Sequence, residues 1–473
     1  MSKKQSGSVS PPTSVREQVS TLLERSLENH LWRQQRCINL IPSEMTPSPL
    51  VRLLQVTDPV GRYAEHNYLT QLGREVYYYQ GTHFIEWVEQ QLIDEFGRYL
   101  GTDQIEPRLI SGQTANMAVF SAVVAFRNRD NKLGEIERIR GVLNHHLNLG
   151  GHLSAQAMGP LRDYVARDPT TGRFMIKHFP VCADNPYRVD VEATAALLDD
   201  WAPELVIFGK SMFLCREPIA EIRQILAERN RRPLIMYDAA HVLGILGPVF
   251  QDPLAEGADI VTGSTHKTFF GTQRGIIASA LNSDSPFAEL WDHIRRRAFP
   301  GFLSNHHLGT LLGLLLAVME MNVFRQEYQS QVIKNAKAFA RALRECNLQV
   351  EGDPAMDFTE THQVLLRVGS HRGIEAAQLL EENNIIVNYQ ALPGDENFAA
   401  SSGLRMGVAE MTRFGMKEAD FQELASFIAD ILLHKKQLGE KVSQFRGRFL
   451  KMHYCFDPAD WPDLTQKLLG TFS

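Results

Sequence analysis

The sequence predicts an α/β protein whose mainly parallel sheet is covered by helices and followed by a smaller α+β unit. The first observation is a set of short apolar runs at residues 204–208, 233–237, 259–261 and 275–278. The second is the helical spacing between the first two runs, where Ile219, Ile222, Ile225 and Leu226 recur. Short strands that are apolar throughout and alternate with helices are typical of a parallel sheet with both faces covered.

The N-terminal region predicts a tail, a helix and an extended segment. Residues 1–13 are polar and rich in Ser and Pro, which is typical of a disordered tail. An amphipathic helix is expected through Val19, Leu22, Leu23, Leu27 and Leu31, with an extended segment at 38–41. Such an arm needs a surface to pack on, either its own body or a partner subunit.

The C-terminal region predicts a buried connecting helix and then the smaller unit. The Leu-rich stretch 308–323 indicates a long buried helix. Beyond residue 325 the expected elements are a helix at 338–343, strands at 363–367 and 404–407, closing helices within 417–449, and a short docked helix within 455–473. The predicted division is an arm at 1–60, a large cofactor domain at 61–300, and a connecting helix with a small domain at 301–473.

Composition excludes several classes of protein. The chain has 473 residues, 44% of them hydrophobic and 22% charged, and a net charge of −6. Without a positive field, nucleic-acid and anionic-membrane partners are not expected. The apolar stretch at 311–321 is about half of what a membrane-spanning helix needs. Five scattered cysteines form no metal or disulfide pattern, no hydrophobic signal-peptide core follows the N-terminus, and a cytoplasmic location is expected.

A lysine and an aspartate after neighbouring apolar runs indicate the chemistry. Lys267 follows the run at 259–261 within Thr-Gly-Ser-Thr-His-Lys-Thr, and a lysine amine at a strand end can form a Schiff base with an aldehyde cofactor such as pyridoxal phosphate. Asp238 directly follows the run at 233–237. A carboxylate there suits the pyridine nitrogen of that cofactor, because a protonated ring is the better electron sink.

Seven motifs in one order give a resemblance to a family. They are Leu-Ile-Pro-Ser-Glu at 40–44, Arg-Tyr-Ala-Glu at 62–65 with Tyr78-Tyr79, Ser-Gly-Gln-Thr-Ala-Asn at 111–116, Gly-Gly-His-Leu at 150–153, Asp-Ala-Ala-His at 238–241, Thr-His-Lys-Thr at 265–268 and Ser-Gly-Leu-Arg-Met-Gly at 402–407. The chain resembles the serine hydroxymethyltransferase family over about residues 38–433. The resemblance implies a fold-type I pyridoxal phosphate enzyme with a seven-stranded sheet and a smaller C-terminal domain.

The resemblance also implies roles for individual residues. Lys267 would hold the cofactor, Asp238 would pair with its ring nitrogen, and His152 would stack on its face. Glu65 would be the acid/base group at the substrate hydroxyl, with Tyr63 nearby. Further implied cofactor contacts are Ser111, Gly112, Gln113, Ser211, His241 and His266. Implied substrate contacts are Ser43, Tyr63, Glu65, Tyr79, Arg274 and Arg405, with Arg405 gripping the carboxylate. No metal is implied, and Tyr63, Glu65, Tyr78 and Tyr79 would serve a site shared with a partner subunit in a homodimer or tetramer.

Departures from the family concern the second substrate. The segment 64–77 is longer than in the family, Gln390 stands where the family has an asparagine near the pterin, and Val-Ala-Glu at 408–410 replaces Thr-Pro-Ala. Residues 299–307 replace a glycine-rich phosphate segment, and Gln113 replaces a serine. Tetrahydrofolate remains a possible second cofactor, but these changes argue against its use.

The predicted reaction is therefore of the aldol type on glycine and β-hydroxy-α-amino acids. Its small-molecule partners are an amino acid and an aldehyde or one-carbon donor, as in a hydroxymethyltransferase or a folate-independent threonine transaldolase. An aminotransferase or a decarboxylase on the same fold is the alternative, and Glu65 favours aldol chemistry over both. A third alternative is a catalytically silent structural paralogue. The presence of Lys267, Asp238, His152 and Arg405 argues against it, because a silent chain has no physical need for all four.

Overall fold

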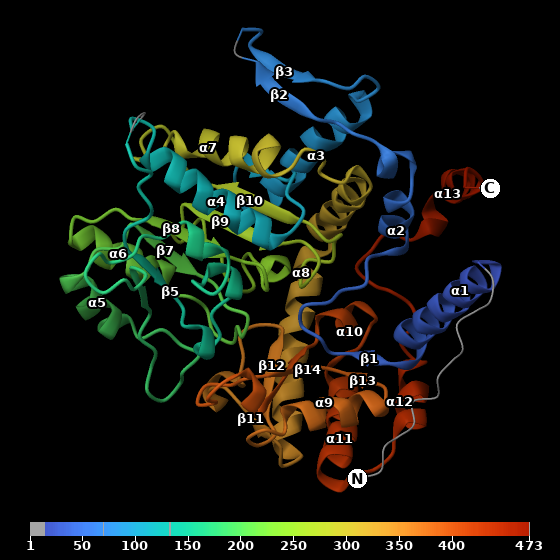
Figure 1. Ribbon diagram of the computed structural model, residues 1–473. Helices are drawn as coiled ribbons and strands as arrows, with labels where there is room; N and C mark the ends of the chain where they lie inside the picture. Colours follow the sequence, from blue (N-terminus) through green and yellow to red (C-terminus); the bar gives the residue numbers. More distant parts are fainter. Residues whose placement is uncertain (1–14, 70, 132–133, 473) are drawn as a thin grey trace.

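The computed structural model describes residues 15–69, 71–131 and 134–472, so the tail expected at 1–13 lies outside the described residues. At its centre lies a seven-stranded sheet with the order β4-β10-β9-β8-β7-β5-β6 (Figure 1). β5 to β9 run parallel, whereas β10 is antiparallel to β9 and β4. The strands are β4 (Gln104–Glu106), β5 (Val142–Asn144), β6 (Ile176–His178), β7 (Leu205–Phe208), β8 (Leu234–Asp238), β9 (Ile260–Ser264) and β10 (Gly275–Ser279).

Both faces of this sheet are buried, which explains the continuous apolar runs in the sequence. In β7, Leu205 and Ile207 face one core and Val206 and Phe208 face the other. The first core is closed by α4 (Gly112–Arg127) and α7 (Leu290–Arg296). The second is closed mainly by α3 (His83–Leu100), α5 (Val191–Asp200), α6 (Ile219–Glu228) and α8. The predicted α/β class with a mainly parallel sheet is confirmed.

The smaller unit is an antiparallel sheet with helices packed against it. Its order is β11-β12-β15-β14. The strands are β11 (Gln349–Val350), β12 (Gln363–Arg367), β14 (Asn388–Gln390) and β15 (Gly403–Gly407), and the helices are α9 (Gly373–Glu382), α10 (Ala409–Arg413), α11 (Glu418–His434) and α12 (Gly439–Arg446). β1 (Ile38–Asn39) pairs in parallel with β13 (Ile385–Ile386), so the N-terminal extended segment is tied to this unit. The predicted domain boundaries themselves stay a prediction.

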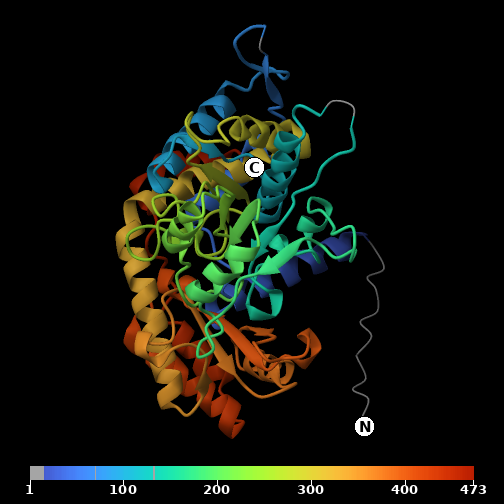
Figure 2. The same ribbon diagram turned by 90° about the vertical axis from the view of Figure 1, so that its left-hand side faces the viewer.

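One helix, α8 (Leu308–Glu345), connects the two units, where two separate helices were predicted at 308–323 and 338–343. Figures 1 and 2 show it running from the large sheet down to the small one. The helix continues through the polar stretch because Tyr328, Val332, Ala336 and Phe339 keep one face buried. By length and composition α8 could span a membrane, but 61% of its most apolar window is buried inside the protein, as in a core helix.

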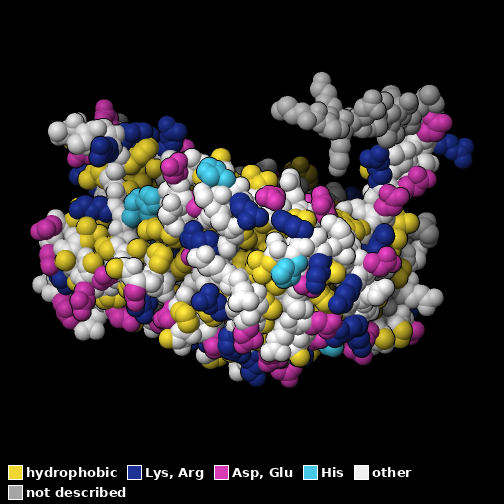
Figure 3. All heavy atoms as spheres, turned by 90° about the horizontal axis from the view of Figure 1, so that it is seen from below, with side chains coloured by type: hydrophobic (Ala, Val, Ile, Leu, Met, Phe, Trp, Pro, Cys, Tyr) yellow, Lys and Arg dark blue, Asp and Glu magenta, His cyan; other side chains and the backbone are white. Residues whose placement is uncertain are grey.

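Three peripheral elements complete the chain. α1 (Val15–Leu31) is a helix as predicted, but none of its residues is buried. α2 (Pro49–Gln55) packs on α8, and the C-terminal segment ends in α13 (Pro462–Gly470), which also has no buried residue. The long segment at 64–77 forms a hairpin, β2 (His66–Leu69) and β3 (Arg74–Tyr77), that projects from the body in Figure 1. On the face seen in Figure 3, acidic and basic side chains are interspersed.

Candidate active site

Five of the predicted site residues follow strands of the large sheet at the same edge. Lys267 comes after β9, Asp238 is the last residue of β8, Ser211 follows β7, His152 follows β5 and Ser111 follows β4. Because these strands run parallel, their carboxyl ends meet at one edge, which is where open α/β sheets bind ligands. The topology therefore brings together residues that are separated by up to about 150 positions in the chain.

Asp238 is held as a buried carboxylate. Its Oδ2 lies 2.6 Å from His152 Nδ1 and accepts a 2.8 Å hydrogen bond from Asn116 Nδ2. Its Oδ1 accepts from the Ala240 N–H at 3.0 Å. Burial acts to raise the pKa of Asp238, but His152 and these hydrogen bonds outweigh burial and lower the pKa to about 2. The residue is thus negatively charged throughout the physiological range, as a partner for a protonated ring nitrogen must be.

Lys267 is a partly buried amine beside a histidine. Its Nζ lies 3.2 Å from His241 Nε2, while the buried His241 Nδ1 has no hydrogen-bond partner among the described residues. Burial lowers the pKa of Lys267 to about 8, with Asp238 opposing that shift and Arg405 adding to it. A substantial fraction of the amine is therefore neutral near pH 8, and a neutral amine is the nucleophile that attacks an aldehyde.

Arg405 lies on β15 of the small sheet and reaches the large one. Its Nη1 donates to the Ser211 carbonyl oxygen at 2.8 Å, and its Nε donates to Asn388 Oδ1 at 3.3 Å. The residue is only 9% exposed, and burial lowers its pKa to about 10. Within the described ranges no carboxylate pairs with it. A buried guanidinium with free donors fits the carboxylate of an incoming substrate.

The remaining predicted site residues lie at the start of α4 and along one cavity. Ser111 caps α4, and the exposed Gln113 lies in the first turn of that helix, where free N–H groups suit a phosphate. Gly112 packs so closely on Ser264 that a Cβ there would clash with its hydroxyl. His266 and Ser43 line one cavity of about 570 Å³. Burial lowers the pKa of His266 to about 4, so this imidazole is neutral.

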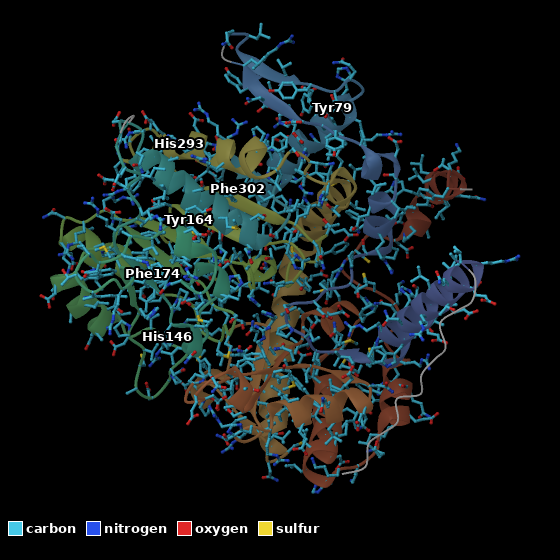
Figure 4. All side chains as sticks on the ribbon, in the orientation of Figure 1. Tyr79, His146, Tyr164, Phe174, His293 and Phe302 are labelled. Carbon is cyan, nitrogen blue, oxygen red and sulfur yellow. The ribbon has the colours of Figure 1, made fainter. Side chains whose placement is uncertain are left out.

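Tyr63, Glu65 and Tyr79 lie elsewhere in this chain. Tyr63 and Tyr79 stack with ring centroids 5.5 Å apart and are about half exposed, and Glu65 precedes the projecting hairpin. Figure 4 shows Tyr79 at the base of that hairpin, on the periphery of the molecule. In the part of the chain that the structure describes, no hydrogen bond, ion pair or ring contact joins these three residues to Lys267 or Asp238.

Arg274, an expected substrate contact, is bound to backbone carbonyl groups in this chain. It is fully buried, and its guanidinium donates to the carbonyl oxygens of His306, His307 and Pro107, with the last two at 3.2 Å. These bonds tie the lysine loop to the segment 299–307. Arg274 therefore holds the backbone of this region, while its buried Nε has no hydrogen-bond partner among the described residues. Its expected contact with the substrate stays a prediction.

Three neighbours of the site were not assigned from the sequence. Asn116 contacts Asp238 and accepts from Thr262 Oγ1 at 2.6 Å. Its place one helical turn after Gly112 could have indicated that it faces the site. His362 is buried near Arg405 and Lys267, and burial lowers its pKa to about 3. Asn388 orients Arg405 across a strand pair that no local pattern predicts.

These residues fit pyridoxal phosphate. The donor set comprises a partly buried lysine of lowered pKa, an ionised carboxylate, neutral imidazoles and a helix N-terminus. Lys267 would hold the aldehyde carbon, Asp238 the ring nitrogen, and the start of α4 the phosphate.

Comparisons with known proteins agree with this geometry. The family model described as "Serine hydroxymethyltransferase" matches residues 17–428. The serine hydroxymethyltransferase of Pyrobaculum calidifontis is 37% identical over 446 residues, covering 93% of this chain and 96% of that protein. That of Archaeoglobus fulgidus is 37% identical over 448 residues, with 93% and 94% covered. A crystal structure of L-threonine transaldolase from Pseudomonas fluorescens, in the internal aldimine state, is similar with a TM-score of 0.80 and 28% identity over 96% of this chain and 97% of that one.

Proposed function

The chain belongs to the serine hydroxymethyltransferase family and is a pyridoxal-phosphate-dependent transferase, and on that premise we propose that it makes and breaks the Cα–Cβ bond of β-hydroxy-α-amino acids, with glycine as the common product or acceptor. The observation that supports an amino-acid substrate is Arg405, a buried guanidinium without a carboxylate partner among the described residues, which shares the site with Lys267 and Asp238.

Each residue of the site contributes a defined step. The cofactor, when bound, withdraws electrons from the substrate Cα. Asp238 keeps its negative charge and so keeps the proton on the ring nitrogen. Arg405 binds the substrate carboxylate and thereby decides which bond at Cα stands perpendicular to the ring. Glu65 exchanges a proton with the β-hydroxyl as the Cα–Cβ bond breaks or forms.

We assign the second substrate to an aldehyde and the reaction to a folate-independent transaldolase. The hairpin β2–β3 lengthens the segment that borders the expected acceptor pocket, and Gln390 stands at the position where the family binds the pterin. The similar solved structure is a threonine transaldolase. The second candidate is folate-dependent hydroxymethyl transfer, which the names of the archaeal relatives favour.

We also propose that the enzyme is a homodimer, or a tetramer built from such dimers, with shared sites. Glu65 and the exposed pair Tyr63 and Tyr79 make no contact with the Lys267 cluster in the described chain, so a second copy supplies them. The apolar side chains of α1 are exposed and would be covered by the same association. All five cysteines are unpaired, which supports a reducing, cytoplasmic location.

The absorption spectrum of the purified holoenzyme tests the proposal. Glycine is added with and without tetrahydrofolate, and a Lys267→Ala variant serves as the control without covalent attachment. A long-wavelength band with glycine alone, together with a new β-hydroxy amino acid from threonine and benzaldehyde, is the expected result. A band that requires folate would replace the transaldolase by the hydroxymethyltransferase.

Two other outcomes contradict the proposal altogether. Transfer of the amino group to a 2-oxo acid, without any aldehyde product, would indicate an aminotransferase. A wild-type spectrum identical to that of the Lys267→Ala control would remove Lys267 from its assigned role.

A further inference from the structure

The short segment at 209–212, directly after β7, touches the main parts of the site. The Ser211 N–H donates to the Gly150 carbonyl oxygen at 2.7 Å, and the His152 N–H donates at 3.4 Å to the carbonyl oxygen of the segment's first residue. The Ser211 carbonyl oxygen accepts the 2.8 Å hydrogen bond from Arg405. One stretch of backbone therefore sets the position of both the His152 loop and the carboxylate-binding arginine.

The first residue of the segment, Gly209, lies close to the backbone of Asp238. Gly209 has a φ of 139°, and a Cβ at this position would lie 2.5 Å from the Asp238 carbonyl oxygen. Only glycine fits this contact. The segment thus begins with a residue packed closely on Asp238, and its next residue, Lys210, adds side-chain contacts that hold it.

Lys210 holds the segment through a buried cluster of charges. Its Nζ lies 3.0 Å from Glu217 Oε1 and donates to the Tyr187 carbonyl oxygen at 2.8 Å. Glu217 Oε2 lies 3.1 Å from His145 Nε2. The side chains of Lys210, Glu217 and His145 are at most 2% exposed. Among the described residues, no hydrogen bond or ion pair joins these three side chains to Lys267 or Asp238.

The cluster spans three elements that meet at the site. His145 directly follows β5, Lys210 follows β7, and Glu217 precedes α6. The Glu217 backbone is itself fixed, because its N–H donates to Gln251 Oε1 at 3.2 Å and its carbonyl oxygen accepts from Gln251 Nε2 at 2.6 Å. The Glu217 carboxylate oxygens lie within ion-pair distance of Lys210 and His145 but have no hydrogen-bond partner among the described residues, so the carboxylate holds the lysine by its charge. Removing one partner of a buried ion pair has a large effect, because it leaves the other charge uncompensated.

We propose that Lys210, anchored by Glu217 and His145, is a positioning residue that fixes the Ser211 carbonyl oxygen and so aims Arg405 at the substrate carboxylate. This inference rests on the proposed role of Arg405. The lysine acts through the backbone, since its own amine is used by Glu217 and Tyr187.

The test compares Lys210→Met, the double variant Lys210→Met with Glu217→Gln, and Lys210→Arg. The double variant removes both charges, so no buried carboxylate is left without its lysine. Glu320→Gln is the matched control, because Glu320 and Arg413 form another fully buried ion pair, 3.3 Å apart, away from this segment. Glycine affinity of each holoenzyme is measured by absorption, and amide hydrogen exchange is measured on the proteins without glycine.

We expect Lys210→Met and the double variant to bind glycine about tenfold more weakly, the size of one weakened charge-assisted hydrogen bond. In both, the Ser211 and His152 amides exchange faster than in the wild type. Lys210→Arg recovers part of the affinity. Glu320→Gln lowers the melting temperature but leaves the glycine affinity and the exchange of these two amides unchanged.

Wild-type affinity and exchange in both Lys210→Met variants would overturn the inference. A loss of melting temperature alone, as in the control, would also overturn it by showing a purely structural role. If the wild-type holoenzyme does not respond to glycine, the proposed function fails, and the exchange of the Ser211 and His152 amides still decides whether Lys210 holds the segment.

Discussion

Replacing Arg405 by lysine tests how the site recognises an amino acid. Arg405 donates from Nε to Asn388 and from Nη1 to the Ser211 carbonyl oxygen. The other N–H groups of its planar fork are left to donate to a substrate carboxylate. Lysine keeps the charge but loses the fork, so one of two charge-assisted hydrogen bonds to the substrate is lost. Such a bond contributes about 2 kcal/mol, which corresponds to about 30-fold weaker binding of glycine.

The assay is a titration of the holoenzyme with glycine, followed by absorption. Methylamine, which has no carboxylate, is expected to affect Arg405→Lys and wild type equally. Arg367→Lys is the matched control, because Arg367 lies on the adjacent strand β12 but pairs with Glu351 at 2.7 Å, and glycine binding should be unchanged. Equal glycine affinity of Arg405→Lys and wild type, at the same melting temperature, would refute the assignment of Arg405.

Three further predictions concern the amine, its supporting network and the assembly. Because folding lowers the pKa of Lys267 from 10.5 to about 8, the unfolded state binds one more proton than the folded state between these pH values, and the stability of the cofactor-free protein should rise with pH across that window. The rate of cofactor capture should increase up to about pH 8 and then level off. A capture midpoint near pH 10 would contradict the burial of the amine. Asn116→Ala should lower the free energy of unfolding by about 1–3 kcal/mol, because Asp238 and Thr262 each lose a hydrogen-bond partner. An unchanged midpoint of chemical denaturation would show that this network is dispensable for stability. When inactive Lys267→Ala and Glu65→Gln proteins are mixed in equal amounts and exchange subunits, about a quarter of wild-type activity should return, because half of the dimers are mixed and each of these has one intact site of two. If subunit exchange is verified and no activity returns, each chain builds its own site.

Much of the fold could be predicted because its signals are local. The apolar runs that became β7, β8, β9 and β10 are continuous in sequence, and both faces of each strand are buried. Lys267 and Asp238 could be located for the same reason, since each comes shortly after such a run. The error at α8 also has a local cause: the prediction followed the Leu-rich stretch and missed the sparser buried stripe through Tyr328 and Phe339.

Contacts between distant residues could not be predicted in this way. The bond between Arg405 and Ser211 joins residues 194 positions apart, and the bond between Asn116 and Asp238 joins residues 122 apart. The charged cluster around Lys210 gave no signal, because a lone lysine in a sequence is usually a solvated surface residue. Only the fold reveals that the guanidinium of Arg274 donates to the backbone carbonyl groups of His306 and Pro107.

The sequence by itself determined the class of fold and the family, and it singled out Lys267 and Asp238 as candidates for cofactor attachment and for the ring nitrogen, because these depend on residue type and on spacing within one element or motif. The tertiary structure decided which side chains share the site, how burial moves the pKa values of Lys267 and Asp238, and that Glu65 stands apart from both in one chain. The physical reason is that desolvation and hydrogen-bond geometry depend on neighbours brought together by the sheet, and those neighbours are not adjacent in the chain.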